Sequence, residues 1–174
     1  MGKKAVVWIS TVLYTLISLA IIAALMAVIQ PKVTELKDKY TVEQTVQSLN
    51  ILDERMMTAK QATGMNLNYR INLDKGALTI DGYNEKIYWN FISKYQYSEE
   101  NKIINVGKIK AVTKPSADLW NVTLSLEYKQ HNINITTNGK DEIKTITPAG
   151  LPYSLWITNK GIKSGISEID ITIE

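Results

Sequence analysis

The hydrophobic pattern of the chain begins with one long stretch that contains no charged residue, from Ala5 to Ile29. About 25 residues at ~1.5 Å per residue form a helix of roughly 37 Å, enough to cross a hydrocarbon core of ~30 Å. Pro31 follows almost directly, and a proline inside a helix removes one backbone donor and clashes with the preceding turn. The pattern therefore predicts an apolar helix with a kink or a short break near Pro31.

After the proline, apolar residues recur at steps of three and four, which is the period of an amphipathic helix. They form two groups along the chain: Val33, Leu36 and Tyr40, then Val42, Val46, Leu49, Leu52 and Met56. Because the spacing shifts phase between Tyr40 and Val42, we expect the buried face of the helix to change there. Lys60 and Gly64 are typical of a helix end, which we expect between Thr58 and Thr63.

From Asn66 onward the period changes to two, as in half-buried β-strands. The alternation is clearest in Trp120–Tyr128, His131–Thr137 and Glu168–Glu174. Further strands are expected at Leu67–Leu73, Ala77–Ile80, Lys86–Ile92, Lys108–Thr113, Glu142–Thr147 and Tyr153–Thr158. The turn sequences between strands are Asp74-Lys75-Gly76, Asp81-Gly82, Asn138-Gly139 and Asn159-Lys160-Gly161. Short strands separated by such turns favour an antiparallel sandwich or barrel.

The sequence thus predicts an α+β protein, with a long N-terminal hydrophobic helix followed by an antiparallel all-β, sandwich-like head. The helix is expected to span residues 6–62, with a hydrophobic half at 6–30, the kink at Pro31 and an amphipathic half at 32–62. The β-rich head is expected to span residues 66–174.

Composition excludes several classes of function. The chain has no Cys, so disulfides, thiolate metal sites and Cys nucleophiles are excluded. The formal net charge is +3, and acidic and basic residues are nearly balanced after the hydrophobic stretch, without a basic stripe for phosphates. We therefore expect no nucleic-acid partner.

Candidate catalytic residues are few. The single histidine, His131, falls on a predicted strand face and is interpreted as structural, because neither a Ser-His-acid set nor a zinc site can be built around it. A Ser/Lys dyad, as in membrane-anchored hydrolases, is formally possible, but Ser164-Gly165 is more typical of a turn. The acidic pairs Glu99-Glu100 and Asp141-Glu142 are interpreted as solvated loop charges. We expect no enzyme activity, no metal and no cofactor.

Two N-glycosylation sequons occur, Asn121-Val122-Thr123 and Asn134-Ile135-Thr136. Both Asn121 and Asn134 fall on the polar faces of predicted strands, where a glycan has room. Both are therefore candidate glycosylation sites.

The N-terminus resembles that of archaeal type IV pilins and the related archaellins. In that family, a peptidase removes a short basic leader at a charged residue, then Gly or Ala, then two small or apolar residues. Lys4-Ala5-Val6-Val7 fits this pattern and implies a leader of residues 1–5, cut between Ala5 and Val6. The fifth residue after this cut is Ser10, whereas bacterial pilins have glutamate there, so the resemblance is to the archaeal members.

The resemblance implies a structural subunit of an extracellular pilus-like filament, in which hydrophobic helices bundle in the core and β heads form the outside. Expected partners are further copies of the chain in a helical filament, the cell membrane before assembly, the prepilin peptidase and the assembly machinery. The expected location is the cell surface. The filament-core residues would be Val6, Val7, Ile9, Val12, Leu13, Leu16, Ile17, Leu19, Ile21, Ile22, Leu25, Val28 and Ile29.

The alternative is a single-pass membrane-anchored envelope protein whose extracytoplasmic β domain binds a partner. An ordinary signal-anchor helix has the same hydropathy. The distribution of Lys residues does not decide the orientation, because Lys3 and Lys4 lie on one side of the stretch and Lys32, Lys37 and Lys39 on the other. We expect the N-terminus inside, since this places the domain with the sequons outside.

Overall fold

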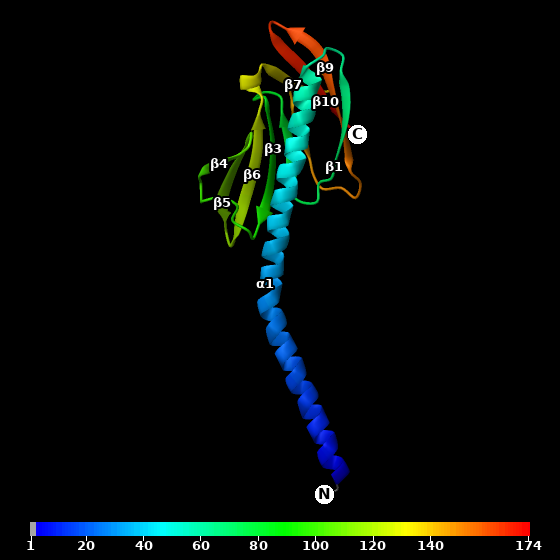
Figure 1. Ribbon diagram of the computed structural model, residues 1–174, viewed down its shortest axis with the longest axis vertical. Helices are drawn as coiled ribbons and strands as arrows, with labels where there is room; N and C mark the ends of the chain where they lie inside the picture. The colour runs from blue at the N-terminus through cyan, green and yellow to red at the C-terminus, as the bar shows by residue number, and fades with distance from the viewer. Residues whose placement is uncertain (1–2) are drawn as a thin grey trace. The chain divides into compact units, whose positions relative to one another are not determined.

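The computed structural model describes the backbone of residues 3–174 and the side chains of Trp8 and residues 11–174. The described part contains one long helix followed by ten strands and a short 3-10 helix, which confirms the α+β class (Figure 1). The elements are α1 (Lys3–Lys60), β1 (Asn66–Ile71), β2 (Ala77–Asp81), β3 (Lys86–Ser93), β4 (Ile103–Val106), β5 (Ile109–Ser116), β6 (Leu119–Glu127), η1 (Lys129–His131), β7 (Ile133–Thr137), β8 (Ile143–Ile146), β9 (Tyr153–Lys163) and β10 (Ile166–Ile173).

Helix α1 ends at Lys60, inside the predicted range. It contains Pro31 and continues through it, so the expectation of a break at this residue is wrong. A proline removes one backbone donor, and one missing bond does not unwind a helix whose neighbouring turns are intact. The kink at Pro31 stays a prediction.

The chain divides into two compact units, Met1–Lys37 and Asp38–Glu174. The second unit, called the head below, therefore contains the last part of α1 as well as all the strands. The first unit, called the N-terminal segment below, consists of the preceding part of α1.

The head contains two sheets, one of four strands and one of six, as expected for a β-sandwich. Their strand orders are β1-β9-β10-β7 and β4-β5-β6-β3-β2-β8. A single core cluster contains side chains of both sheets and of one face of α1. The α1 residues in it are Val42, Leu49, Leu52, Met56 and Ala59. Leu36 and Tyr40, in contrast, are more than 60% exposed. The apolar stripe is therefore buried from Val42 onward and exposed before it, and a change from one buried face to another stays a prediction.

The sheets differ from the sequence prediction in two respects. Strand β7 pairs with β10 in parallel, whereas all other paired strands in the described residues are antiparallel. The tight turn at Asn138-Gly139 does not join two strands of one sheet, because β7 and β8 belong to different sheets. In addition, β4 was not predicted, since its sequence Ile103-Ile104-Asn105-Val106 does not alternate.

The predicted turn at Asn159-Lys160-Gly161 is also wrong. These residues lie inside β9, where the pairing register with β10 shifts at a bulge and Gly161 adopts a φ of 120°. The hairpin turn instead lies at Ser164-Gly165, as the sequence favoured there, and both of its residues have positive φ. A bulge tolerates the extra residue because Gly161 reaches a φ that residues with a Cβ rarely adopt.

The bulge brings the side chain of Asn159, which is 1% exposed, to the C-terminal end of α1. Its Nδ2 donates to the carbonyl of Ala59 at 2.9 Å and to that of Lys60 at 3.3 Å, while its Oδ1 accepts from the Gly161 amide at 2.8 Å. The last carbonyls of a helix have no partners within the helix. Asn159 therefore supplies, from a strand 99 residues further along the chain, the cap that this buried helix end needs.

We predict that Asn159→Ala destabilises the head by about 1–3 kcal/mol, because it leaves the carbonyls of Ala59 and Lys60 buried without donors. The measurement is chemical unfolding of the full chain in detergent micelles, followed by tryptophan fluorescence. The exposed residue Asn68 provides the matched control, and Asn68→Ala should change the unfolding free energy by less than about 0.5 kcal/mol. Equal effects of the two variants would contradict the capping role.

Candidate functional site

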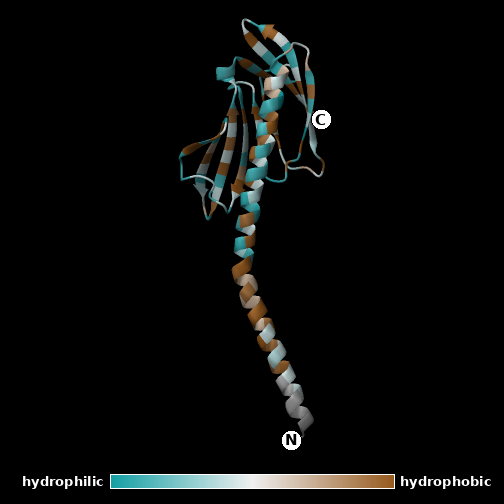
Figure 2. Ribbon diagram, in the orientation of Figure 1, coloured by the Kyte–Doolittle hydropathy of each residue, from teal (hydrophilic) through white to brown (hydrophobic). Residues whose placement is uncertain are grey.

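The N-terminal segment exposes nearly all of its apolar side chains. By length and composition, α1 is the one helix in the described residues that is apolar enough to cross a membrane, and none of its most apolar window is buried. Figure 2 shows hydrophobic residues concentrated in this stretch, whereas hydrophilic residues become frequent in the later part of α1. Such a surface requires lipid or protein cover, because water cannot solvate it favourably. The segment fits a membrane span or a signal-like anchor.

The structure describes ten of the thirteen predicted filament-core side chains. Each of these is at least 40% exposed: Val12, Leu13, Leu16, Ile17, Leu19, Ile21, Ile22, Leu25, Val28 and Ile29. The side chains of Val6, Val7 and Ile9 lie outside the described residues. The same holds for the side chains of the proposed processing site Lys4-Ala5-Val6, whose backbone belongs to α1.

One hydroxyl group of this stretch, that of Thr15, has a partner within the helix. Thr15 Oγ1 donates to the carbonyl of Val12 at 2.8 Å, so this hydroxyl has a partner in lipid or in a helix bundle. Thr11, Thr15 and Ser18 also line an open hollow of about 440 Å³, together with Tyr14, Leu19 and Ile22. Small side chains at this spacing allow a neighbouring helix to approach closely.

One line of exposed apolar residues runs along the segment at alternating steps of three and four. We call it the seam, and it consists of Leu19, Ile22, Met26, Ile29, Val33, Leu36 and Tyr40, all exposed. This spacing is the seven-residue repeat by which two helices pack knobs into holes. The sequence prediction omitted Met26 from the helix core, although the repeat would have identified it.

The seam continues past the end of the uncharged stretch at Ile29. Val33 and Leu36 lie among the charged residues Lys32, Glu35 and Lys37, and yet are 42% and 65% exposed. Lys32 Nζ and Glu35 Oε2 form an exposed ion pair at 2.9 Å in the same part of the helix. The last two seam positions before the head are therefore exposed apolar residues among charged ones.

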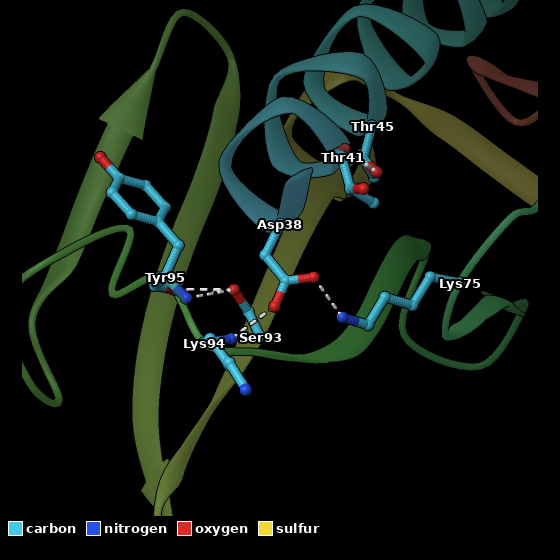
Figure 3. Close-up of polar contacts among 7 residues, drawn as sticks. All are labelled: Asp38, Thr41, Thr45, Lys75, Ser93, Lys94 and Tyr95. Atoms are coloured by element: carbon cyan, nitrogen blue, oxygen red, sulfur yellow. Dashed lines mark hydrogen bonds and ion pairs between the residues drawn. The ribbon is translucent and has the colours of Figure 1, made fainter. Parts of the chain in front are cut away.

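At the start of the head, the buried carboxylate of Asp38 links α1 to two loops (Figure 3). One oxygen accepts from Lys75 Nζ at 2.5 Å and the other from the backbone amide of Lys94 at 2.6 Å. The neighbouring Lys39 places its Nζ 5.9 Å from the centre of the Tyr95 ring. The sequence carried no signal for this cluster, since Lys75 and Lys94 lie 37 and 56 residues from Asp38.

The charged residues that lie near His131 in the head form ion pairs. His131 lies in η1, before β7, so its placement on a strand is wrong; a left-handed Asn132 delays the strand to Ile133. Its side chain lines a hollow that also contains Asp53 and Glu127. Both carboxylates have lysine partners, at 2.7 Å from Lys108 and 2.6 Å from Lys110. The Lys110 hydrogen bond holds the pKa of the Glu127 carboxyl below its ordinary value.

Within the described residues, no group of three or more His, Asp or Glu side chains is placed to hold a metal ion. Ser164, the serine considered for a dyad, lies in the β9–β10 turn. The acidic residue Glu99 pairs with Lys102, as a solvated loop charge would. In the described part of the head, Asp53, Glu99 and Glu127 thus each pair with a lysine.

The two sequon asparagines occupy different positions. Asn121 lies in β6, between β3 and β5 in the six-stranded sheet. Asn134 lies in β7, the outermost strand of the four-stranded sheet, and its Nδ2 donates to Asp141 Oδ1 at 3.4 Å.

Comparisons of the chain with protein-family models, with curated proteins and with solved structures found no match. The class that fold and site define is an α+β protein in which a long apolar helix near the N-terminus leads into a β-sandwich head.

We predict that Asp38→Ala destabilises the head by about 1.5–3 kcal/mol, because it removes two charge-assisted hydrogen bonds and leaves the Lys94 amide without its acceptor. Hydrogen exchange should show the largest loss of protection in the helical turn that begins at residue 38. Glu35→Ala is the matched control on the same helix; its exposed ion pair with Lys32 should contribute less than about 0.5 kcal/mol. If protection of residues 38–45 were unchanged in Asp38→Ala, the proposed link would be refuted.

Proposed function

We propose that the protein is a structural subunit of an extracellular, type IV pilus-like filament, with its apolar helices bundled in the core and its heads outside. The observation that carries this proposal is the seam, which extends beyond the length that a membrane requires. About 25 uncharged residues already exceed the ~30 Å of the hydrocarbon core. Val33 and Leu36 lie beyond these residues. A membrane anchor does not require exposed apolar side chains outside the hydrocarbon core.

A bundle of helices gives these residues a role. In a bundle, the seam of one copy packs against helices of neighbouring copies, and the cover that lipid provides up to Ile29 is continued by protein at Val33 and Leu36. Head-to-tail contacts between identical subunits that do not close into a ring generate a helical filament. The prepilin-like junction Lys4-Ala5-Val6 supports the same function, since its cleavage would remove Lys3 and Lys4 from a helix destined for an apolar core.

A second candidate is a single-pass envelope protein that keeps α1 in the membrane and binds a partner through its head. The fit of the uncharged stretch to a lipid bilayer favours it. The two functions differ in what happens to the N-terminus and in whether the protein leaves the membrane.

The first test is electron microscopy of the fraction sheared from native cells, combined with mass spectrometry of the N-terminus. A filament subunit should begin at Val6, and Ala5→Asp should block processing and abolish filaments while the head stays folded. Ala5→Gly is the matched control, because glycine also fits the resembled processing pattern, and it should retain filaments. Monomeric, membrane-bound protein with Lys3 and Lys4 intact would contradict the filament function and support the anchor.

The second test addresses the seam. We predict that Leu36→Gln reduces filament yield at least about tenfold, because losing a large part of the ~1.5–3 kcal/mol of a buried leucine weakens each subunit contact by that order. Thr34→Gln is the matched control, since it introduces the same side chain two residues away, on the opposite side of the helix, and should leave the yield unchanged. Both variants should insert into membranes normally. Undiminished filaments with Leu36→Gln would show that the seam is not an interface.

A further inference from the structure

Strand β1 lies at one end of the four-stranded sheet, and its outer edge is open. In the described residues it pairs only with β9. Ser154 of β9 exchanges both backbone hydrogen bonds with Glu174 on the β10 side, so the residues before and after Ser154 turn their backbone groups to β1. Their partners across the ladder are Tyr69 and Ile71. By the same alternation, three exposed residues of β1 point their amide and carbonyl groups away from β9: Asn66, Asn68 and Arg70.

In the described residues, the head leaves this edge without a cover. No hydrogen bond within that part of the chain reaches the backbone of the three edge residues. Helix α1 lies next to β1, where the Tyr69 hydroxyl donates to the carbonyl of Ser48 at 3.0 Å (Figure 1). Between the two elements, however, a hollow of about 240 Å³ remains, lined by Gln47 and Ile51 of α1 and by Arg70 of β1, among others. The helix therefore leaves the edge of β1 accessible to another strand.

The other sheet ends differ from β1. At β7, the Ile135 amide donates to Glu85 Oε2 at 2.5 Å, and Thr137 exchanges both backbone hydrogen bonds with Lys140, so this edge is occupied. Strands β4 and β8 have only four residues each, against six in β1, and alternation leaves them fewer open positions. Proteins normally shorten, charge or cover such edges, because an open edge is a template for pairing with another chain. The edge of the head best suited to receive a strand is thus that of β1.

A second copy of β1 is complementary to this edge. If the two strands run antiparallel with Asn68 opposite Asn68, all three open residues of each copy fall into hydrogen-bonded pairs, with Arg70 opposite Asn66. The two Arg70 positions are then four residues apart along the ladder, roughly 14 Å, which exceeds the screening length of about 8 Å. A register that places Arg70 opposite Arg70 brings like charges together, and the remaining registers match fewer open residues. Charge and hydrogen bonding thus select one pairing.

We propose that β1 is a self-association surface, at which β1 of one copy pairs antiparallel with β1 of a second copy about a two-fold axis at Asn68. The two four-stranded sheets become one continuous sheet across the contact. The second copy lies beside the hollow, and Ile51, an α1 side chain that is 42% exposed, gains a neighbour there. The partner of this surface is therefore the same surface of another copy, as in isologous dimers.

The symmetry of the contact places it between filaments. A two-fold axis reverses the direction of β1, and with it the direction of the α1 turns that run beside β1 in each head. Subunits of one helical filament repeat head to tail and point in one direction. The paired heads therefore belong to two filaments that lie side by side in opposite directions. The pairing itself is independent of the proposed function, and only its place between filaments rests on that function.

The experiment uses single-cysteine variants of the full-length protein in detergent micelles, because the chain has no Cys of its own. Opposed residues of a hydrogen-bonded pair have Cα atoms about 5.5 Å apart, within the reach of a disulfide. Under mild oxidation, Asn68→Cys should form at least about fivefold more cross-linked dimer than Asn66→Cys or Arg70→Cys alone. An equimolar mixture of Asn66→Cys and Arg70→Cys should form the mixed dimer. Equal dimer yields from the three variants, or none from Asn68→Cys, would overturn the pairing.

A second experiment blocks the edge in the same assay. Asn68→Pro, added to both partners of the Asn66→Cys and Arg70→Cys mixture, should lower the yield of mixed dimer at least about tenfold, because proline removes an open amide and obstructs an added strand. Asn68→Ala is the matched control, since it keeps the backbone amide, and it should leave the yield unchanged. Tryptophan fluorescence verifies that both heads are folded. An undiminished yield with Asn68→Pro would show that the contact does not use the backbone of β1.

Electron microscopy of the sheared surface fraction separates this inference from the proposed function. Wild-type filaments should associate side by side, and Asn68→Pro filaments should remain single. Single wild-type filaments, without the cross-link in Asn68→Cys, would overturn this inference alone. Cross-linked Asn68→Cys dimers of a protein that forms no filaments would overturn only the proposed function.

Discussion

Cover for apolar side chains is the constraint on which this structure depends. Along α1, apolar residues continue almost from end to end, but the head covers only the face that begins at Val42. Before that residue, the helix turns its apolar side chains to the outside. The head therefore buries the apolar face of its own part of the helix. The apolar side chains of the N-terminal segment need lipid or another protein to cover them.

The head holds its part of α1 at both ends with buried polar groups. Asp38 joins the first turn to the loops that carry Lys75 and Lys94, and Asn159 caps the last turn. Hydrophobic burial is not directional, so it would tolerate some rotation or sliding of the helix. Hydrogen bonds to fixed backbone groups do not tolerate such movement, because a buried donor or acceptor that loses its partner destabilises the fold. The two residues thus fix which face of the helix the core receives.

The fold was predictable wherever a signal is local. Periodicity alone indicated most of the strands, and the phase shift between Tyr40 and Val42 coincides with the point where burial of the helix begins. Prediction failed where the local structure depends on residues far away in the sequence. Asn159-Lys160-Gly161 has the composition of a turn, yet the end of α1 needs the Asn159 amide and the segment forms a bulge within β9. Likewise, nothing in the sequence of β7 states that its neighbour is β10, in parallel.

The same distinction applies to the candidate sites. The uncharged stretch is visible in sequence because lipid and helix bundles both require only a run of apolar residues. The two sequons were equally visible, but their surroundings come from segments far apart in the chain. Asn134 meets the β9–β10 hairpin at Lys163 and Glu168, while the side-chain oxygen of Asn121 is buried in the six-stranded sheet.

For the proposed filament, the free-energy difference between the membrane-anchored and the bundled helix depends on residues that lie outside the lipid. Lipid tails are about as apolar as leucine, so moving residues up to Ile29 from lipid into a bundle changes the hydrophobic free energy little. Val33, Leu36 and Tyr40 are different, because in the anchored state they face water or headgroups. Burying them gains free energy that lipid cannot supply, of the order of 25 cal/mol for each Å² covered. Under this function, the short part of the seam beyond the membrane, and not the long apolar run within it, provides the hydrophobic driving force for assembly.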